Sequence, residues 1–327
     1  MPGQDFINAI HHTAKTAVFG TGTSIACVEL MEEIGVFFPD AHLDAEKMAL
    51  LAQAGHTVIG LDVVMPLFSV CHETAAMGCD IDWGKLDQMP FCKNIIYTDP
   101  KDIIIPSNFL NRPSCRIPLA AIAMLKKRLG TSAAICGKAF GPWTLGYHLF
   151  GIENFLIDTV ENPSRIFAII EKLSAVTIAF ANAQIEAGAD CILLGDHATA
   201  DLCSPTAYKK YLQLTHHMLA EKINAPVILH ICGNTSDRIQ MISQTGINCF
   251  HYDTKSGTHA DIRGLAGGKM ALMGGISNVT LLHGNPEEVN AQAGKALEAG
   301  IDVVGPECAV PLKTLLRNLK AILSSTK

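Results

Sequence analysis

EAGADCILLGD, which spans residues 186–196, joins the end of a predicted helix to the start of a predicted strand. Gly188 suits the left-handed conformation that commonly ends a helix, because glycine has no Cβ atom. The apolar run that follows has the length of a strand, and its near-continuous hydrophobicity is typical of a strand covered on both faces of a parallel sheet. This stretch therefore predicts a helix-to-strand junction of an α/β protein.

The same junction occurs three more times along the chain. A short helix end with a glycine precedes an apolar run at Gln53-Ala54-Gly55, at Gln244-Thr245-Gly246 and at Glu298-Ala299-Gly300. Four similar junctions in one chain predict a repeated βα architecture.

Eight core strands are found when every plausible apolar run is counted, and helical patterns lie between successive members. Eight βα units favour a closed TIM-type (β/α)8 barrel over an open doubly wound sheet, and we expect residues 1–327 to form a single domain. Residues 91–118 contain four prolines and interrupt this rhythm, which predicts an excursion between strands 2 and 3. The predicted strands are Ala17–Gly20, Val58–Val63, Ser132–Gly137, Asp190–Leu194, Val227–Ile231, Asn248–Tyr252, Met270–Met273 and Asp302–Val304.

The composition is that of a chain with a large apolar core. Of the 327 residues, 49 % are hydrophobic and 17 % are charged, and the net charge of −6 argues against a nucleic-acid binder. No stretch approaches about 18 uninterrupted apolar residues, and residues 1–5 lack the pattern of a signal peptide, so we expect a cytoplasmic protein without a membrane partner. The eleven cysteines include no CxxC pair, which argues against a disulfide framework and against a zinc ribbon.

Polar and reactive side chains follow the predicted strands at the points where these end. In a barrel these ends share one rim, where the loops build the active site. Solvated loops also carry polar residues, so the identities matter more than the clustering. The residues are Thr21, Asp62, Lys138, Asp196, His197, His230, Cys232, Asp253, Ser277, Asn278, Glu307 and Cys308.

A candidate metal site lies at the end of the fifth predicted strand. Strand alternation points His230 and Cys232 the same way, and Cys308 follows the eighth strand, so barrel closure could bring it to the same rim. One histidine and two thiolates suit tetrahedral zinc and leave the fourth position open. The alternative is a core histidine beside a buried cysteine. Cys249 and His251 form a rival pair without an obvious third ligand.

LHICGNTSDRI at Leu229–Ile239, GPECAVPLKT at Gly305–Thr314 and MGGISN at Met273–Asn278 resemble the methylcobamide:coenzyme M methyltransferases of the uroporphyrinogen decarboxylase superfamily. The resemblance implies a (β/α)8 barrel in which His230, Cys232 and Cys308 bind zinc. It implies methyl transfer from a methylated corrinoid protein to the thiol of coenzyme M, as in methanogenesis from methylated compounds. The second motif looks more like the methylamine branch.

A thiol acceptor explains why these ligands would be needed. A free thiol with a pKa near 8.5 is only about 3 % ionised at pH 7, and the thiolate is the nucleophile. Zinc deprotonates a bound thiol, and two cysteinate ligands would keep the metal electron-rich and a third thiolate nucleophilic. The DxHxxG corrinoid signature is absent from the chain, so we expect a partner protein to carry the corrinoid.

Further site residues are expected around the metal. We predict that Gly275, Ser277 and Asn278 form a pocket for the sulfonate of coenzyme M, and the alternative is an ordinary capped turn. Asp253 and Glu307 are candidate catalytic residues that would orient a ligand or relay the thiol proton, and each is alternatively a structural carboxylate. Lys138, Asp196 and His197 are weaker candidates: Lys138 could balance an anionic substrate, although a lysine at a strand end is usually exposed, whereas Asp196 and His197 could support the metal ligands.

Other functions remain open at this point. A metal-free uroporphyrinogen-type decarboxylase would need arginines at the mouth, and residues 16–30 contain none. The acceptor could instead be another thiol, such as homocysteine, or a folate. A non-enzymatic corrinoid-binding or zinc-binding protein could use the same barrel mouth without turnover.

Overall fold

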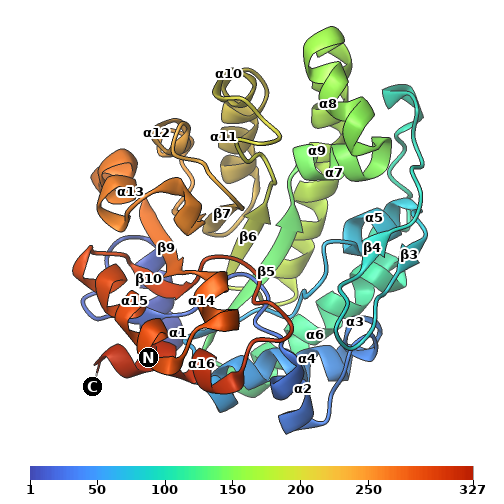
Figure 1. Cartoon of the computed structure of the whole chain (residues 1–327). Helices are drawn as coiled ribbons and strands as arrows, with labels where there is room; N and C mark the ends of the chain where they lie inside the picture. The colour runs from blue at the N-terminus through green and yellow to red at the C-terminus, as the bar shows by residue number, and fades with distance from the viewer. Residues whose placement is uncertain (327) are drawn as a thin grey trace.

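Eight parallel strands form a nearly closed barrel in the computed structural model, which describes residues 1–326 (Figure 1). Their order around the wall is β1-β10-β9-β8-β7-β6-β5-β2. The predicted TIM-type barrel is thereby confirmed. The strands are β1 (Val18–Phe19), β2 (Val63–Val64), β5 (Ala134–Phe140), β6 (Cys191–Gly195), β7 (Val227–Ile231), β8 (Cys249–Tyr252), β9 (Ala271–Ile276) and β10 (Val303–Pro306).

Two hydrogen bonds of Asp62, one from its backbone and one to its carboxylate, join the two ends of the sheet, β1 and β2. The Asp62 N–H donates to the Phe19 carbonyl, and the Phe19 N–H donates to Oδ2 of Asp62, each at 2.9 Å. The Asp62 carboxylate thus takes the place of a strand ladder at this point in the wall.

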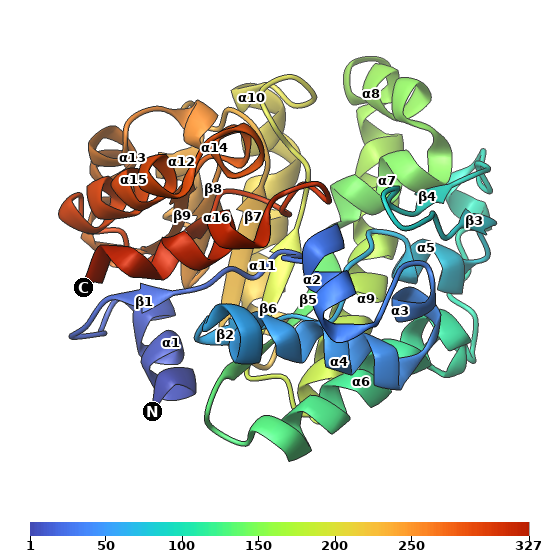
Figure 2. The same cartoon turned by 60° about the horizontal axis from the view of Figure 1, so that its bottom comes forward.

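Helices surround the strands on the outside, as Figure 1 shows. At the N-terminal end, α1 packs against β1, β2, β5, β9 and β10 and covers that end of the barrel, beside β1 in Figure 2. The α-helices are α1 (Pro2–Ile10), α2 (Val28–Ile34), α3 (Asp40–Leu43), α4 (Ala45–Ala54), α5 (His72–Met77), α6 (Pro113–Leu129), α7 (Pro142–Phe150), α8 (Ile152–Glu161), α9 (Pro163–Glu186), α10 (Pro205–Ala207), α11 (Gln213–Lys222), α12 (Ile239–Ile242), α13 (His259–Ala266), α14 (Asn278–His283), α15 (Pro286–Glu298) and α16 (Leu316–Ala321).

Three of the four predicted glycine junctions have the expected backbone. Gly188, Gly246 and Gly300 have φ values of 116°, 80° and 73°, which are left-handed. Gly55 does not, because its φ is −56° and the chain continues from α4 into a π-helical turn, η1 (Gly55–Ile59). Gly60, at φ 101°, ends that turn instead. The second strand is therefore Val63–Val64, and the prediction of Val58–Val63 was wrong at its start.

The excursion between β2 and β5 contains a small antiparallel hairpin, β3 (Ile81–Asp82) with β4 (Phe91–Cys92). The segment predicted for the excursion, residues 91–118, covers only part of it. Proline is well placed in the first turn of a helix, where its missing N–H is not needed, and α6 accordingly starts at Pro113.

Every residue of the strands from β5 to β10 is buried, as expected for strands covered on both faces. Within the described residues, α9 is the one helix long and apolar enough to meet the length and composition criteria for crossing a membrane. It packs against β5 and α7 and buries residues such as Leu173 and Phe180, so it serves as a core helix of the barrel. Core helices commonly meet those criteria, and the finding carries little weight.

Candidate metal centre

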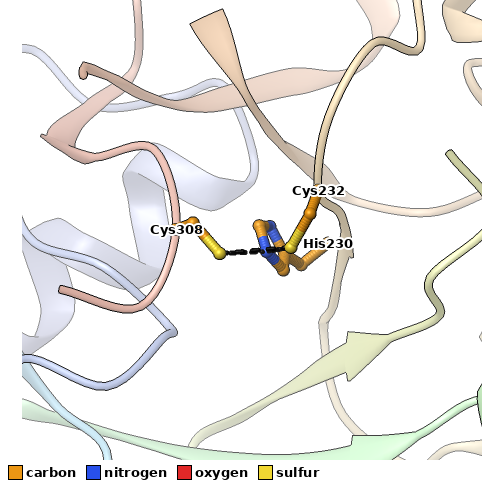
Figure 3. Close-up of side chains that lie close together, drawn as sticks. All are labelled: His230, Cys232 and Cys308. Carbon is orange, nitrogen blue, oxygen red and sulfur yellow. Dashed lines mark hydrogen bonds between the residues drawn. The ribbon is translucent and has the colours of Figure 1, made fainter. Parts of the chain in front are cut away.

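His230, Cys232 and Cys308 lie together at the C-terminal end of the barrel, with their side chains pointing toward one another (Figure 3). Nε2 of His230 is 3.0 Å from Sγ of Cys232 and 3.3 Å from Sγ of Cys308, and the two sulfurs are 3.1 Å apart. One ion bonded at about 2.0–2.3 Å to each atom can bridge such a group. Among residues 1–326 this is the one group of three or more ligand side chains close enough to share an ion, and Cys249 and His251 do not form a second.

The ends of two strands place these ligands. His230 and the buried Ile231 close β7, and Cys232 follows directly, so alternation turns the two ligands to the same side. Cys308 comes two residues after β10. Nδ1 of His230 lies 3.1 Å from the carbonyl oxygen of His251, which fixes the ring and leaves Nε2 free for a metal.

The two thiols differ in acidity. Their mutual contact lowers the pKa of Cys308 well below its usual value, and the same contact, together with burial, raises the pKa of Cys232. Of the eleven cysteines only Cys92, Cys232 and Cys308 are partly exposed, and the other eight are buried. Thiolate character and access are both needed for metal binding, and Cys308 combines the two.

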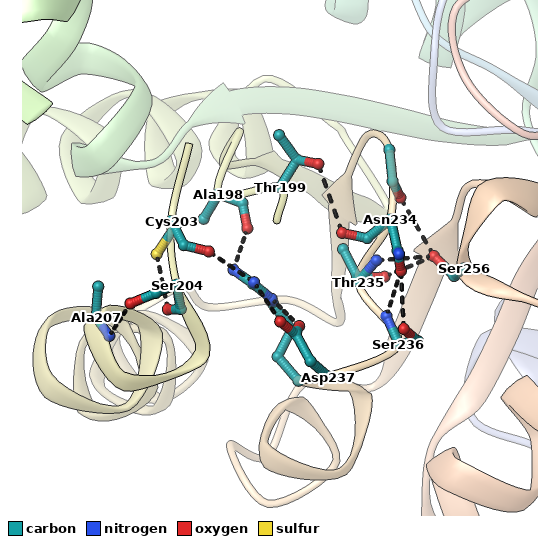
Figure 4. A network of polar contacts seen from close by, with 12 residues as sticks. Ala198, Thr199, Cys203, Ser204, Ala207, Asn234, Thr235, Ser236, Asp237 and Ser256 are labelled. Atoms are coloured by element: carbon teal, nitrogen blue, oxygen red, sulfur yellow. Dashed lines mark hydrogen bonds and ion pairs between the residues drawn. The ribbon is translucent and has the colours of Figure 1, made fainter. Parts of the chain in front are cut away.

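The loop after Cys232 is anchored from both sides, as Figure 4 shows in part. The Gly233 N–H donates to Oδ2 of Asp253 at 2.9 Å, and the Thr235 N–H donates to Oγ of Ser256 at 3.0 Å. On the other side the fully buried Arg238 guanidinium donates to the carbonyls of Ala198 and Cys203, at 2.6 and 2.7 Å. It also pairs with Asp237.

Glu307 connects three loops of the rim. Its Oε1 accepts from the Asn278 N–H at 2.7 Å, and its Oε2 accepts from the N–H of Thr254 at 3.0 Å and from the Thr254 hydroxyl. The loops after β8, β9 and β10 are thereby joined next to Cys308. Asp253 is similarly engaged, because Oδ1 accepts from the Lys255 N–H at 2.9 Å. Both carboxylates are well placed to position the metal ligands, and direct catalytic roles for them stay predictions.

We expect Glu307→Gln to weaken zinc binding by up to about 10-fold, because an amide NH2 group would face donors that now meet a carboxylate and so disturb the loop that carries Cys308. This is the lower limit of the effect found for outer partners that bond a metal ligand directly. Competition with a chromogenic chelator measures the affinity. Glu287→Gln, on the exposed surface of α15, is the matched control. Equal zinc affinity of the two variants would contradict a positioning role for Glu307.

The loop predicted to bind the sulfonate lines a different hollow from the one beside His230 and Cys232. Gly275 and Ser277 line a hollow of about 320 Å³ with His259 and Lys295, and a Cβ atom on Gly275 would come within 2.8 Å of Ala296 on the helix side. The N–H groups of Ser277 and Asn278 already have protein acceptors, Gln292 and Glu307. Sulfonate binding by this loop stays a prediction, with its backbone donors already in use.

A small cavity of about 120 Å³ opens beside His230 and Cys232 and is mostly apolar. The sequence pointed to its wall residues His197 and Asp196 but missed the others. Asp196 accepts from the Thr144 N–H at 2.8 Å, and its Oδ2 lies 3.1 Å from Nε2 of His216, so it positions α7 rather than the metal ligands. The GPWTL stretch at Gly141–Leu145, directly after β5, could have pointed to those near it in the sequence, whereas no local signal marks Val70 or Gly195. The missed residues are Val70, Phe140, Thr144, Tyr147, His148 and Gly195.

A (β/α)8 barrel with three candidate metal ligands beside a cavity at its C-terminal mouth is the architecture of a barrel enzyme. Comparison with known proteins gives the family: the chain belongs to the uroporphyrinogen decarboxylase (URO-D) family, whose model matches residues 16–327. It is 32 % identical over 301 residues to a methylated-thiol–coenzyme M methyltransferase of Methanosarcina mazei, covering 91 % of this chain and 81 % of the relative. It is 32 % identical over 308 residues to the methylcobamide:CoM methyltransferase MtaA of Methanosarcina barkeri, covering 93 % and 90 %. A solved methyltransferase structure from Methanosarcina mazei superposes with a TM-score of 0.96 at 29 % identity, covering 99 % of this chain and 97 % of that one.

Proposed function

We propose that this protein is a zinc-dependent methyltransferase that moves a methyl group from a methyl-Co(III) corrinoid, carried by a partner protein, to the thiol of coenzyme M. The observation that carries the proposal is the cluster of one imidazole and two thiols at the barrel mouth. The names of the two curated relatives support coenzyme M as the acceptor. A metal-free decarboxylase would leave this cluster without a purpose.

His230, Cys232 and Cys308 would hold the zinc, and bound zinc supplies deprotonation of the substrate thiol at neutral pH. Three protein ligands leave one position for that thiol. The partner's corrinoid would give up the methyl group to the sulfur and keep the electron pair of the broken Co–C bond as Co(I). The corrinoid supplies this chemistry, and the chain supplies orientation and a dry, largely apolar wall beside the ligands.

The corrinoid protein would dock transiently over the mouth, where the loops after the strands end. An interface at the small end of the usual range suits a partner that must leave after each transfer. The residues of the site do not identify the methyl donor from which the corrinoid protein receives its methyl group. The GPECAVPLKT motif favours a methylamine-type donor, which stays a prediction.

The test is a metal analysis of the purified protein, followed by demethylation of methylcobalamin with coenzyme M and homocysteine in parallel. We expect about one zinc per chain and cobalamin(I) formation that depends on coenzyme M. Faster turnover with homocysteine would reassign the acceptor. A zinc-loaded protein that binds thiol but never demethylates methylcobalamin would favour a binding protein over the proposed enzyme.

A further inference from the structure

Lys138 lies inside the barrel and close to the cavity beside the metal ligands. It is two residues before Phe140 on β5, so the two side chains share the inner face of that strand. Phe140 lines the cavity together with His230 and Cys232, and Nζ of Lys138 is 5.4 Å from the centre of the Phe140 ring. Only 6 % of Lys138 is exposed. The expectation of a solvent-exposed lysine at this strand end was wrong.

The ammonium group of Lys138 has no hydrogen-bond or ion-pair partner among residues 1–326, apart from its contact with the Phe140 ring. Among carboxylates, that of Glu73 has the largest effect on the pKa of Lys138. It accepts a hydrogen bond from the Phe140 N–H at 2.8 Å instead and lies beyond ion-pair distance of Lys138. Holding a charge on a largely buried side chain without an anion is costly. A binding partner that is absent from the chain itself would remove that cost.

The charge states of the groups around Lys138 favour binding of an anion beside its ammonium group rather than of a cation. Burial lowers the pKa of Lys138 to about 8, while Glu73, Cys308, Cys136 and Cys71 oppose the shift. His72 and His42 also face this space, and burial lowers the pKa of each to about 3, so both are neutral at pH 7. Burial raises the pKa of Glu73 to about 7, which leaves it only partly charged.

The position of Lys138 in the barrel wall relative to the three candidate ligands also suits a role in substrate binding. Between β5 and β10 lie four strands one way round the wall and two, β2 and β1, the other way, so Lys138 and the Cys308 loop are on different sides of the barrel. Phe140, on the same face of β5 as Lys138, lines the cavity that His230 and Cys232 also line. A short ligand bound to the metal through one end would therefore direct its other end toward β5.

We propose that Lys138 binds the anionic end of the thiol substrate, a sulfonate, and so makes the site selective for charged mercaptans. This inference rests on the proposed function and adds the residue that selects its substrate. It is the alternative to the predicted sulfonate site at Gly275, Ser277 and Asn278, where the N–H groups of Ser277 and Asn278 already have acceptors. The sulfonate oxygens accept hydrogen bonds from the ammonium group while the sulfur of the same molecule occupies the open metal position. Phe140 forms the apolar wall against which the two methylene groups pack.

Two thiols that differ at one end test the proposal. Calorimetry compares coenzyme M with 2-mercaptoethanol, which carries a hydroxyl in place of the sulfonate, on the zinc-loaded protein. We expect the wild type to bind coenzyme M about 10- to 100-fold more tightly, as for a hydrogen bond to a charged group. Lys138→Met should lose that preference and keep its affinity for 2-mercaptoethanol within about twofold. Lys209→Met, at an exposed position, is the matched control.

Equal affinities of the wild type for the two thiols would overturn the proposal without any variant. So would a Lys138→Met protein that retains zinc, its circular dichroism spectrum and the full preference for coenzyme M. Binding of ethanesulfonate, which has no thiol, to the zinc-free wild type separates this inference from the proposed function. Its loss in Lys138→Met would support the Lys138 site even if no methyl transfer is found.

Discussion

Cys308→Ala should lose more than about 100-fold in zinc affinity and a comparable part of its coenzyme M methylation rate. Only His230 and Cys232 would remain to hold the ion, and even outer partners of metal ligands cost about 10- to 100-fold when removed. Without the metal the substrate thiol is only about 3 % ionised at pH 7, so the nucleophile becomes scarce. Metal analysis and the methylcobalamin assay measure the two effects.

Cys92→Ala is the matched control for this experiment, because Cys92 is the third partly exposed cysteine and lies on the excursion hairpin. It should retain zinc and most of the methylation rate. A Cys308→Ala protein that keeps stoichiometric zinc and normal turnover would remove the metal centre from the mechanism altogether.

Arg238→Met should lower the free energy of unfolding by about 3–5 kcal/mol, the second large effect that the structure indicates. The guanidinium is fully buried, and its loss would leave the carbonyls of Ala198 and Cys203 without donors and Asp237 without its cation. Each such hydrogen bond to a charged group contributes about 1.5–3 kcal/mol. Urea unfolding followed by circular dichroism measures the change.

Arg317→Met, at an exposed position on α16, should change the free energy of unfolding by no more than about 0.5 kcal/mol. Equal stability of the two variants would show that the Ala198–Arg238–Cys203 connection is dispensable. A folded but destabilised Arg238→Met protein should still bind zinc, because Arg238 touches none of the three ligands.

The grouping of His230, Cys232 and Cys308 could be predicted from the sequence because two simple rules suffice for it. Alternation turns His230 and Cys232 to one side, and the convergence of parallel strand ends brings Cys308 near. The left-handed glycines at three junctions follow from local backbone preference in the same way. Gly55 is the exception, because the helix before it continues into a π-helical turn instead of ending there. The local sequence pattern did not indicate this continuation.

The supporting residues could not be assigned in this way. Glu307 and Asp253 were recognised as rim carboxylates, but their acceptor roles depend on N–H groups of three different loops. The lack of a partner for the Lys138 ammonium is likewise a property of the folded interior. It arises because the Glu73 carboxylate accepts a hydrogen bond from the Phe140 N–H, which the sequence does not reveal. Such pairings are long-range, and no periodicity in the chain encodes them.

The Asp62 seam between β1 and β2 is the one place among the described residues where neighbouring strands of the wall lack a ladder. From β2 through β5 and on to β10 and β1 the backbone pairing is continuous, and the three candidate ligands and Lys138 lie on β5, on β7 or in the loops after β7 and β10. Movement at the seam would therefore displace β1 and β2 first, and these two strands carry none of the candidate ligands.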